Sequence, residues 1–352
     1  MTVDQQSVSV QEILWELADP DTEYFQRTFR RLRDLFPDES TEACLYYLAE
    51  KGLTPSGQEI ASWLSLGNRY VKPLFDESIL SLAVASKASA ALCKIDLEIS
   101  TKFLAAVQCY SAPHALMRPL ALISALDDYT ALLPWLGELA GVSDDRVRSR
   151  AAKLLYALRP DSNQIKAQLQ DTSSRVRANV LEGLWKANLP AAIDLFKAAL
   201  TDENPRVVGN ALVGLYLQGD SSALPSIIEL SQSPDAAMRA AMAWSLGYIK
   251  AERGIPPLQR LSMDASLNVR KHAHSGLVTL QREAWQRAVR EQFEALRDAK
   301  TANLDPTELE ELKCRYQLRS DVAFAKLRAA EESELQFAAQ HPDQFERLIS
   351  TP

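Results

Sequence analysis

The histidines are the residues of this 352-residue chain best suited to hold a metal, but their spacing argues against it. There are four, and the closest pair, His272 and His274, is separated by two positions. Two positions on an α-helix turn through about 200°, so the two rings point to different sides. Metal ligands on one helix are typically spaced by three or four residues. The sequence therefore predicts no metal site.

The cysteines are equally unsuited to a metal site or a disulfide framework. No two of them form a Cys-x-x-Cys pair; they are Cys44, Cys93, Cys109 and Cys314. Widely spaced cysteines are typical of reduced thiols packed as small hydrophobic residues. We expect neither zinc nor disulfides.

Sequence motifs for catalysis are missing as well. The chain has no Gly-x-x-x-x-Gly-Lys-Ser/Thr phosphate loop and no Gly-x-Ser-x-Gly nucleophile elbow, two motifs that would have indicated a phosphate site or a hydrolase. We predict no cofactor, and binding is favoured over catalysis.

An internal repeat must position whatever residues do bind. Short segments with a central apolar residue recur at intervals of 29, 31, 31 and 31 residues, and these anchors are Val147, Val176, Val207, Met238 and Val269. Positions 0, +4, +8 and +11 from each anchor are mostly apolar, which is one stripe of an α-helix. A second apolar stretch precedes each anchor, with Asp171, Asp202 or Asp264 in the short joint between them. Each unit is predicted to be helix, tight turn, helix.

Segments such as SRVRANVLEGLW and AAMRAAMAWSLGYIKAERGIPPLQRL resemble the HEAT-like repeats named from phycobiliprotein lyases. The chain is also similar to bacterial HEAT-repeat proteins, and the resemblance is clearest over residues 130–280. It implies an all-α fold, an α-solenoid of helical hairpins, and usually a binding role, although the family includes a few enzymes.

Three regions follow from this pattern. Residues 1–73 are expected to form an irregular helical N-terminal region or cap, and residues 74–280 the repeat array. Residues 281–352 are charge-rich, and Asp305-Pro306-Thr307-Glu308 indicates a helix start within them. This third region is predicted to be a helical cap or a partner-binding extension, because terminal repeats need a polar outer face.

The inner surface of the superhelix supplies the candidate site. At 100° per residue, positions +3, +6 and +10 point away from the buried arc. On successive repeats these positions predict an apolar patch of Val213, Leu217, Trp244 and Tyr248, edged by Asn179, Asn210 and His272. Such a patch is typical of a partner site. Two alternatives stay open: the chain's own C-terminal helices cover this face, or the helical phase is off by one position.

Two further columns of residues favour structural roles. The arginines at +1 are expected to pair with the joint aspartates of adjacent units, since guanidinium and carboxylate groups match in geometry; these arginines are Arg148, Arg177, Arg239 and Arg270. The aromatic residues at +9 are expected to pack between repeats; they are Tyr156, Trp185 and Tyr216.

The charge balance points to a protein partner. The net charge is −7 and the pI about 5.3, which disfavours nucleic acid. No apolar run approaches the ~20 residues that cross a bilayer, and the N-terminus does not resemble a secretory signal, so we expect a cytoplasmic protein. The sequence predicts a non-catalytic scaffold or adaptor. The alternative is an enzyme on a HEAT scaffold, either a phycobilin lyase or isomerase or, less favoured, a DNA glycosylase.

Overall fold

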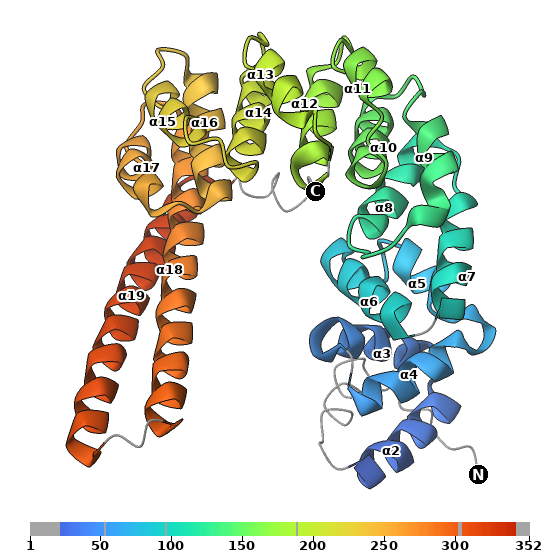
Figure 1. The fold of residues 1–352 in the computed structure, drawn as a ribbon. Helices are drawn as coiled ribbons and strands as arrows, with labels where there is room; N and C mark the ends of the chain where they lie inside the picture. Colours follow the sequence, from blue (N-terminus) through green and yellow to red (C-terminus); the bar gives the residue numbers. More distant parts are fainter. Residues whose placement is uncertain (1–21, 53, 96, 188, 302–304, 343–352) are drawn as a thin grey trace. The chain divides into compact units, whose positions relative to one another are not determined.

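Helices form every regular element of residues 22–52, 54–95, 97–187, 189–301 and 305–342, the part of the chain described by the computed structural model (Figure 1). This confirms the predicted all-α solenoid fold class. The chain divides into two compact units, residues 1–159 and residues 160–352. Residues 1–21 and 343–352, which were expected to belong to the terminal caps, lie outside the described residues.

The described residues of the first unit run from α2 to α10. Its helices are α2 (Thr22–Leu35), α3 (Pro37–Lys51), α4 (Pro55–Ser65), α5 (Val71–Phe75), α6 (Leu82–Ile95), α7 (Leu97–Gln108), α8 (Pro113–Ile123), α9 (Leu133–Leu139) and α10 (Asp145–Leu158), with short 3-10 turns η1 (Leu66–Asn68) and η2 (Thr130–Leu132). Helix α6 lies centrally and packs against α3, α7 and α8. Pro37, Pro55 and Pro113 each occupy the first turn of a helix, where proline removes no helical hydrogen bond.

Arg118 ties the start of the array together inside this unit. Its side chain is buried, and Nε and Nη2 donate to the carbonyl oxygens of Leu74 and Leu80 at 2.7 and 2.8 Å. The buried guanidinium therefore satisfies carbonyls at the end of α5 and in the segment before α6, which would otherwise lack partners away from water.

The second unit is a regular stack of helix pairs. It contains α11 (Ser162–Gln168), α12 (Ser174–Gly183), η3 (Leu184–Lys186), α13 (Ala192–Ala199), α14 (Pro205–Leu217), α15 (Ala223–Leu230), α16 (Ala236–Ile249), η4 (Glu252–Gly254), α17 (Ile255–Leu261), α18 (Leu267–Thr301) and α19 (Pro306–Gln340). The anchor-bearing helices α12, α14, α16 and α18 pack one against the next, and α11, α13, α15 and α17 each pack on the helix that follows them. The anchors Val176, Val207 and Val269 are buried, whereas the anchor Met238 is only partly buried. Each pair thus buries its apolar stripe against its neighbours, as the 31-residue period predicted.

Arginine and aspartate link neighbouring pairs at two of the three interfaces in this stack. Arg177 makes a bidentate contact with Asp202, at 2.7 Å from Nε to Oδ2 and 2.9 Å from Nη2 to Oδ1. Arg239 repeats the same contact with Asp264 at 2.7 and 2.9 Å. The Nη1 of each arginine also donates to carbonyls of its own preceding turn, in the case of Arg177 to that of Asp171 at 2.9 Å. These contacts confirm the structural interpretation of the +1 arginines at these two positions.

The last repeat continues into a long helical hairpin. Helix α18 runs through the expected 280/281 boundary without a break, and α19 begins after the N-cap Asp305, as predicted. The ion pairs Arg282–Glu331 and Arg319–Glu291 show that α19 returns antiparallel along α18. With 35 residues, each helix is about 50 Å long. The hairpin therefore extends well beyond the repeats of its own unit (Figure 1).

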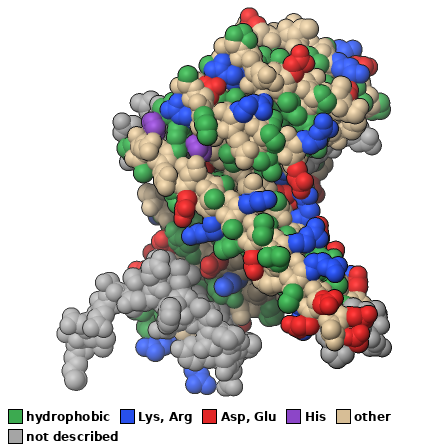
Figure 2. Space-filling view, turned by 90° about the vertical axis from the view of Figure 1, so that its left-hand side faces the viewer, with side chains coloured by type: hydrophobic (Ala, Val, Ile, Leu, Met, Phe, Trp, Pro, Cys, Tyr) green, Lys and Arg blue, Asp and Glu red, His purple; other side chains and the backbone are tan. Residues whose placement is uncertain are grey.

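Lysine and arginine side chains lie interspersed with aspartate and glutamate on the face of the molecule in Figure 2. Within the described part of the chain, none of the helices is long and apolar enough to span a membrane.

Candidate partner-binding groove

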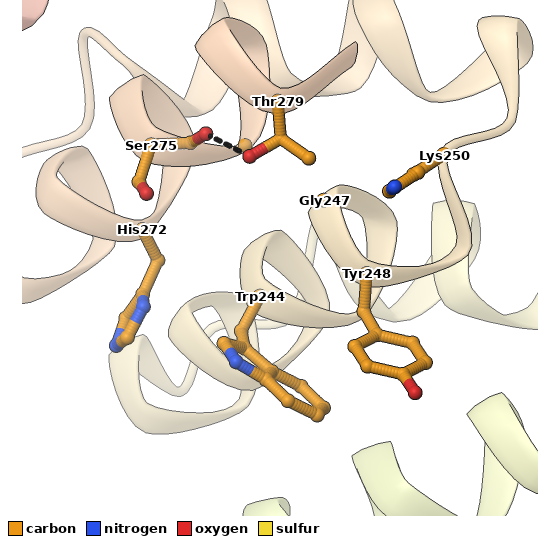
Figure 3. A pocket seen from close by; sticks show the side chains of 8 residues that line it. Trp244, Gly247, Tyr248, Lys250, His272, Ser275 and Thr279 are labelled. Atoms are coloured by element: carbon orange, nitrogen blue, oxygen red, sulfur yellow. Dashed lines mark hydrogen bonds between the residues drawn. The ribbon is translucent and has the colours of Figure 1, made fainter. Parts of the chain in front are cut away.

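Trp244 and Tyr248 on α16 and His272 on α18 line one groove (Figure 3). They were predicted to share a surface, and the structure brings them together around a volume of about 500 Å³. Trp244 and Tyr248 are one helical turn apart, so their side chains project from the same side of α16. The opposite wall carries the hydroxyl groups of Ser275 and Thr279 from α18.

Two glycines form the floor of this groove. Gly247 of α16 faces Gly276 of α18, and a Cβ added at Gly247 would lie 2.8 Å from the Cα of Gly276. Backbone therefore meets backbone where the helices cross, which only residues without a side chain allow. This close approach places the aromatic wall and the hydroxyl wall on the two sides of one groove.

Trp185 extends the aromatic wall across α14. Its ring lies 4.6 Å from that of Tyr248 and 6.1 Å from that of Trp244, measured between centroids, and Trp244 stacks on Tyr248 at 5.5 Å. Its indole Nε1 donates to the carbonyl oxygen of Asn210 at 2.9 Å. The sequence suggested packing between repeats for Trp185, and the buried ring does that; its contact with the groove residues was not foreseen.

Three of the predicted surface residues are buried instead, which corrects the sequence-based expectation of their exposure. Val213 is 0% exposed, Asn210 1% and Asn179 7%. Helix α14 is packed by α12 on one side and α16 on the other, and Trp185 reaches across it. The Asn210 amide donates to the carbonyl of Ala178 at 2.8 Å, and so links α14 to α12.

Leu217 remains at the surface. It occupies the C-terminal end of α14, where the flanking helices no longer cover it, and is 44% exposed. It holds the same repeat position on α14 that Tyr248 holds on α16. The accessible part of the predicted patch therefore consists of Leu217, Trp244, Tyr248 and His272.

The C-terminal helices leave the groove open. Tyr248 is 40% exposed with α18 and α19 in place. On α18, His272 lines the groove, whereas His274 stacks on Phe337 of α19 at 4.9 Å between ring centroids. Arg270, which has no further repeat to pair with, lies over the same Phe337 ring at 5.7 Å. Helix α19 thus packs on the side of α18 that carries His274.

Local electrostatics keep His272 neutral and Tyr248 protonated. Burial, together with the nearby charge of Lys271, lowers the pKa of His272, and burial together with Glu182 raises the pKa of Tyr248. Both groups can therefore exchange neutral hydrogen bonds with a ligand near pH 7. Lys250 at the groove's end has a left-handed backbone conformation (φ 54°), and its Nζ lies 3.3 Å from Glu283.

The described residues contain no group of three or more His, Cys, Asp or Glu side chains placed to hold a metal ion. The groove combines aromatic faces, hydroxyl groups and one lysine, which suits it to hold a side chain of another molecule.

Two known repeat families match parts of the second unit. The HEAT repeat family matches residues 162–234, and the PBS lyase HEAT-like repeat matches residues 238–262. No curated protein matches the chain.

Several solved structures are similar to the chain. Human deoxyhypusine hydroxylase in complex with glycerol is 18% identical, with 78% of this chain and 96% of that chain covered and a TM-score of 0.29. An engineered protein is 14% identical over 95% and 94% of the two chains, with a TM-score of 0.29. The karyopherin Kap121p bound to the SUMO protease Ulp1p is 14% identical over 99% of this chain and 45% of that one, with a TM-score of 0.36. The family matches and the stacked helix pairs that they cover identify residues 162–234 and 238–262 as HEAT-type repeats.

Proposed function

We propose that this protein is a non-catalytic scaffold that binds another protein on the inner surface of its repeat array. The main support for this proposal is the open groove in which Trp244 and Tyr248 remain accessible beside His272. Aromatic side chains at the centre of an interface contribute large contact areas and dominate binding energy. Leu217, one repeat away, would extend the contact surface.

A protein partner suits the surface better than a nucleic acid. The chain carries a net charge of −7, and the face in Figure 2 mixes both signs of charge. Nucleic-acid binding depends on neutralising many phosphates with a concentrated basic surface. A peptide segment needs only pockets for individual side chains and a few polar contacts.

The proposal places the scaffold in the cytoplasm. Cys44, Cys93, Cys109 and Cys314 are all free, and free thiols suit a reducing compartment.

The test is capture of a partner from a lysate of the native host, followed by measurement of its affinity with purified proteins. Wild type is compared with a Trp244→Ala, Tyr248→Ala double variant and with Met263→Ala. Met263 is 86% exposed and outside the groove, so it supplies a matched loss of exposed apolar surface. We expect wild type and Met263→Ala to bind the partner equally. The double variant, still folded by circular dichroism, should bind at least tenfold more weakly. Equal binding by all three proteins would refute the groove as the site.

A further inference from the structure

Two inner helices begin with exposed arginines on the same stripe as the groove residues. Arg175 opens α12 and Arg206 opens α14, and both side chains are exposed. They hold the position one residue before the anchor. At 100° per residue, positions −1, +3, +6 and +10 all fall within about 60° of one another around the helix. The arginines therefore face the side of the array to which Trp244 and Tyr248 belong.

The contacts of Arg206 support this placement. Its Nη2 donates to the Asn179 side-chain oxygen at 2.7 Å, and that residue holds the +3 position of the neighbouring helix. Partial burial lowers the pKa of Arg206, and of the nearby charges Glu182 raises this pKa and Arg175 lowers it. Glu182 also acts on Tyr248, so the arginines and the aromatic wall share one electrostatic environment.

The distance between the arginines and the groove level sets a length for the ligand. Position −1 and position +6, where Trp244 stands on α16, are about 10 Å apart along the helix axis. Arg206 lies one helix away from Trp244 and Arg175 lies two helices away, which adds about 9 Å and about 18 Å across the array. An extended chain advances about 3.3 Å per residue, so about four residues reach Arg206 and about six reach Arg175. A segment that runs obliquely across the helices can therefore reach the groove and the arginines at once.

We propose that the partner segment is an extended acidic peptide, in which an aromatic or proline ring enters the groove and an Asp or Glu about four to six residues away pairs with Arg175 and Arg206. This inference rests on the proposed function and names the partner's chemistry. The glycine floor and the walls formed by Trp244, Tyr248, Ser275 and Thr279 suit a flat ring. The exposed guanidinium groups favour a carboxylate, which they can bind through two hydrogen bonds.

A single-stranded nucleic acid would also offer flat rings and negative charge, but the observations favour the peptide. Glu182 lies beside both features, and it would repel a chain with a phosphate at every unit. A peptide can place one carboxylate at the arginines and leave the neighbourhood of Glu182 uncharged.

The experiment selects from a random dodecapeptide display library on the full-length protein. Counter-selection uses the Trp244→Ala, Tyr248→Ala variant, so that only peptides dependent on the groove are kept. We expect these peptides to combine an aromatic residue or proline with Asp or Glu about four to six positions away. The affinity of the most enriched peptide is then measured by fluorescence anisotropy in 50 and 500 mM salt.

Charge reversal separates the acidic-peptide inference from the proposed function. Arg206→Glu and Arg175→Glu are each expected to weaken the peptide at least tenfold in 50 mM salt, and less in 500 mM salt because ions screen exposed charges. Arg260→Glu makes the same change of charge at an exposed position on the outer helix α17 and should leave affinity unchanged. Arg206 contacts Asn179 in the wild-type protein, so Arg206→Glu could impair folding. Arg175→Glu therefore serves as the second, independent variant.

Three results would overturn the inference. Groove-dependent peptides that are basic or uncharged, or that bind the arginine variants as tightly as wild type, would refute acidic recognition and leave the protein-binding function standing. Tighter binding of a labelled dT12 oligonucleotide than of any selected peptide would favour nucleic acid. If no peptide depends on Trp244 and Tyr248, the groove itself fails as a peptide site, and with it the proposed function at this location.

Discussion

Replacing Gly247 by alanine tests whether the contact between α16 and α18 is as close as the structure indicates. The new Cβ would lie 2.8 Å from the Cα of Gly276, and the atom it meets is backbone, which cannot rotate away. The two helices would have to separate. Forcing an extra methyl group into a packed site typically costs about 1–3 kcal/mol.

An opposing effect must be subtracted from this cost. Alanine is favoured over glycine inside a helix by about 0.5–1 kcal/mol. We therefore expect a net loss of about 1–2 kcal/mol in the free energy of unfolding. For a unit the size of residues 160–352, this corresponds to a fall of roughly 2–8 °C in the melting temperature.

The assay is thermal unfolding followed by circular dichroism, with Gly137→Ala as the matched control. Gly137 lies within α9, and a Cβ added there meets nothing within 4 Å. The same substitution at this position should be neutral or should stabilise by up to about 1 kcal/mol. An increase in stability with Gly247→Ala, equal to that with Gly137→Ala, would show that α16 and α18 are not in backbone contact at Gly247 and Gly276.

Two further predictions concern the core and the links between repeats. Leu246→Ala should lower the free energy of unfolding by about 2–5 kcal/mol, because Leu246 is 0% exposed. Trp244→Ala should lower it less, since the Trp244 ring is only partly buried. Chemical denaturation compares the two variants, and equal losses would contradict the assignment of Trp244 to the groove surface. The hydrogen-bonded guanidinium of Arg239 lowers the pKa of Asp264, so the stability that this carboxylate contributes is fully present above its unfolded pKa of about 3.9 and is lost as the pH falls through the lower folded value. Asp264→Asn should therefore be less stable than wild type at pH 7 in urea unfolding, with a gap that narrows below about pH 4; a gap independent of pH would refute an ionic role.

Much of the repeat array was predictable because its regularities are local. An apolar stripe at helical spacing fixes which side of α12 and α14 is buried, and Val176 and Val207 are indeed in the core. The joint aspartates were predictable as partners of the arginines because their offset repeats: Asp202 follows Arg177, and Asp264 follows Arg239, by 25 positions.

The candidate site was predictable in part, because direction around a helix does not give the depth of burial. Trp244, Tyr248 and His272 meet as their shared phase predicted. Val213 has the same phase as Trp244 and is fully buried, since its helix has a neighbour on each side and a ring lying across it. That ring belongs to Trp185, which follows α12 in the 3-10 turn η3. A 3-10 turn advances 120° per residue instead of 100°, so the α-helical count does not predict its direction.

The interface between α14 and α16 lacks the arginine–aspartate pair of its neighbours and is packed instead by the rings of Trp185, Trp244 and Tyr248. At this interface the arginine position is occupied by Val208 and the aspartate position by Ser233, so both members of the ionic pair are replaced together. A lone arginine or aspartate there would leave a partly buried charge without its partner, which is costly. The two helices instead approach closely at Gly209, whose added Cβ would lie 3.1 Å from the Ser245 hydroxyl.

The Trp185 side chain spans this interface. Its indole Nε1 donates a hydrogen bond to the Asn210 carbonyl of α14, and its ring packs against Tyr248 of α16. The residues that replace the missing ionic link are therefore also the residues that form the wall of the groove. Among the repeat interfaces that the structure describes in this unit, a ligand held against Trp244 and Tyr248 would contact the one that depends on aromatic packing rather than on an arginine–aspartate pair. Its binding should protect the backbone amides of α14 and α16 from hydrogen exchange more than those of α12, and uniform protection across the three helices would contradict this coupling.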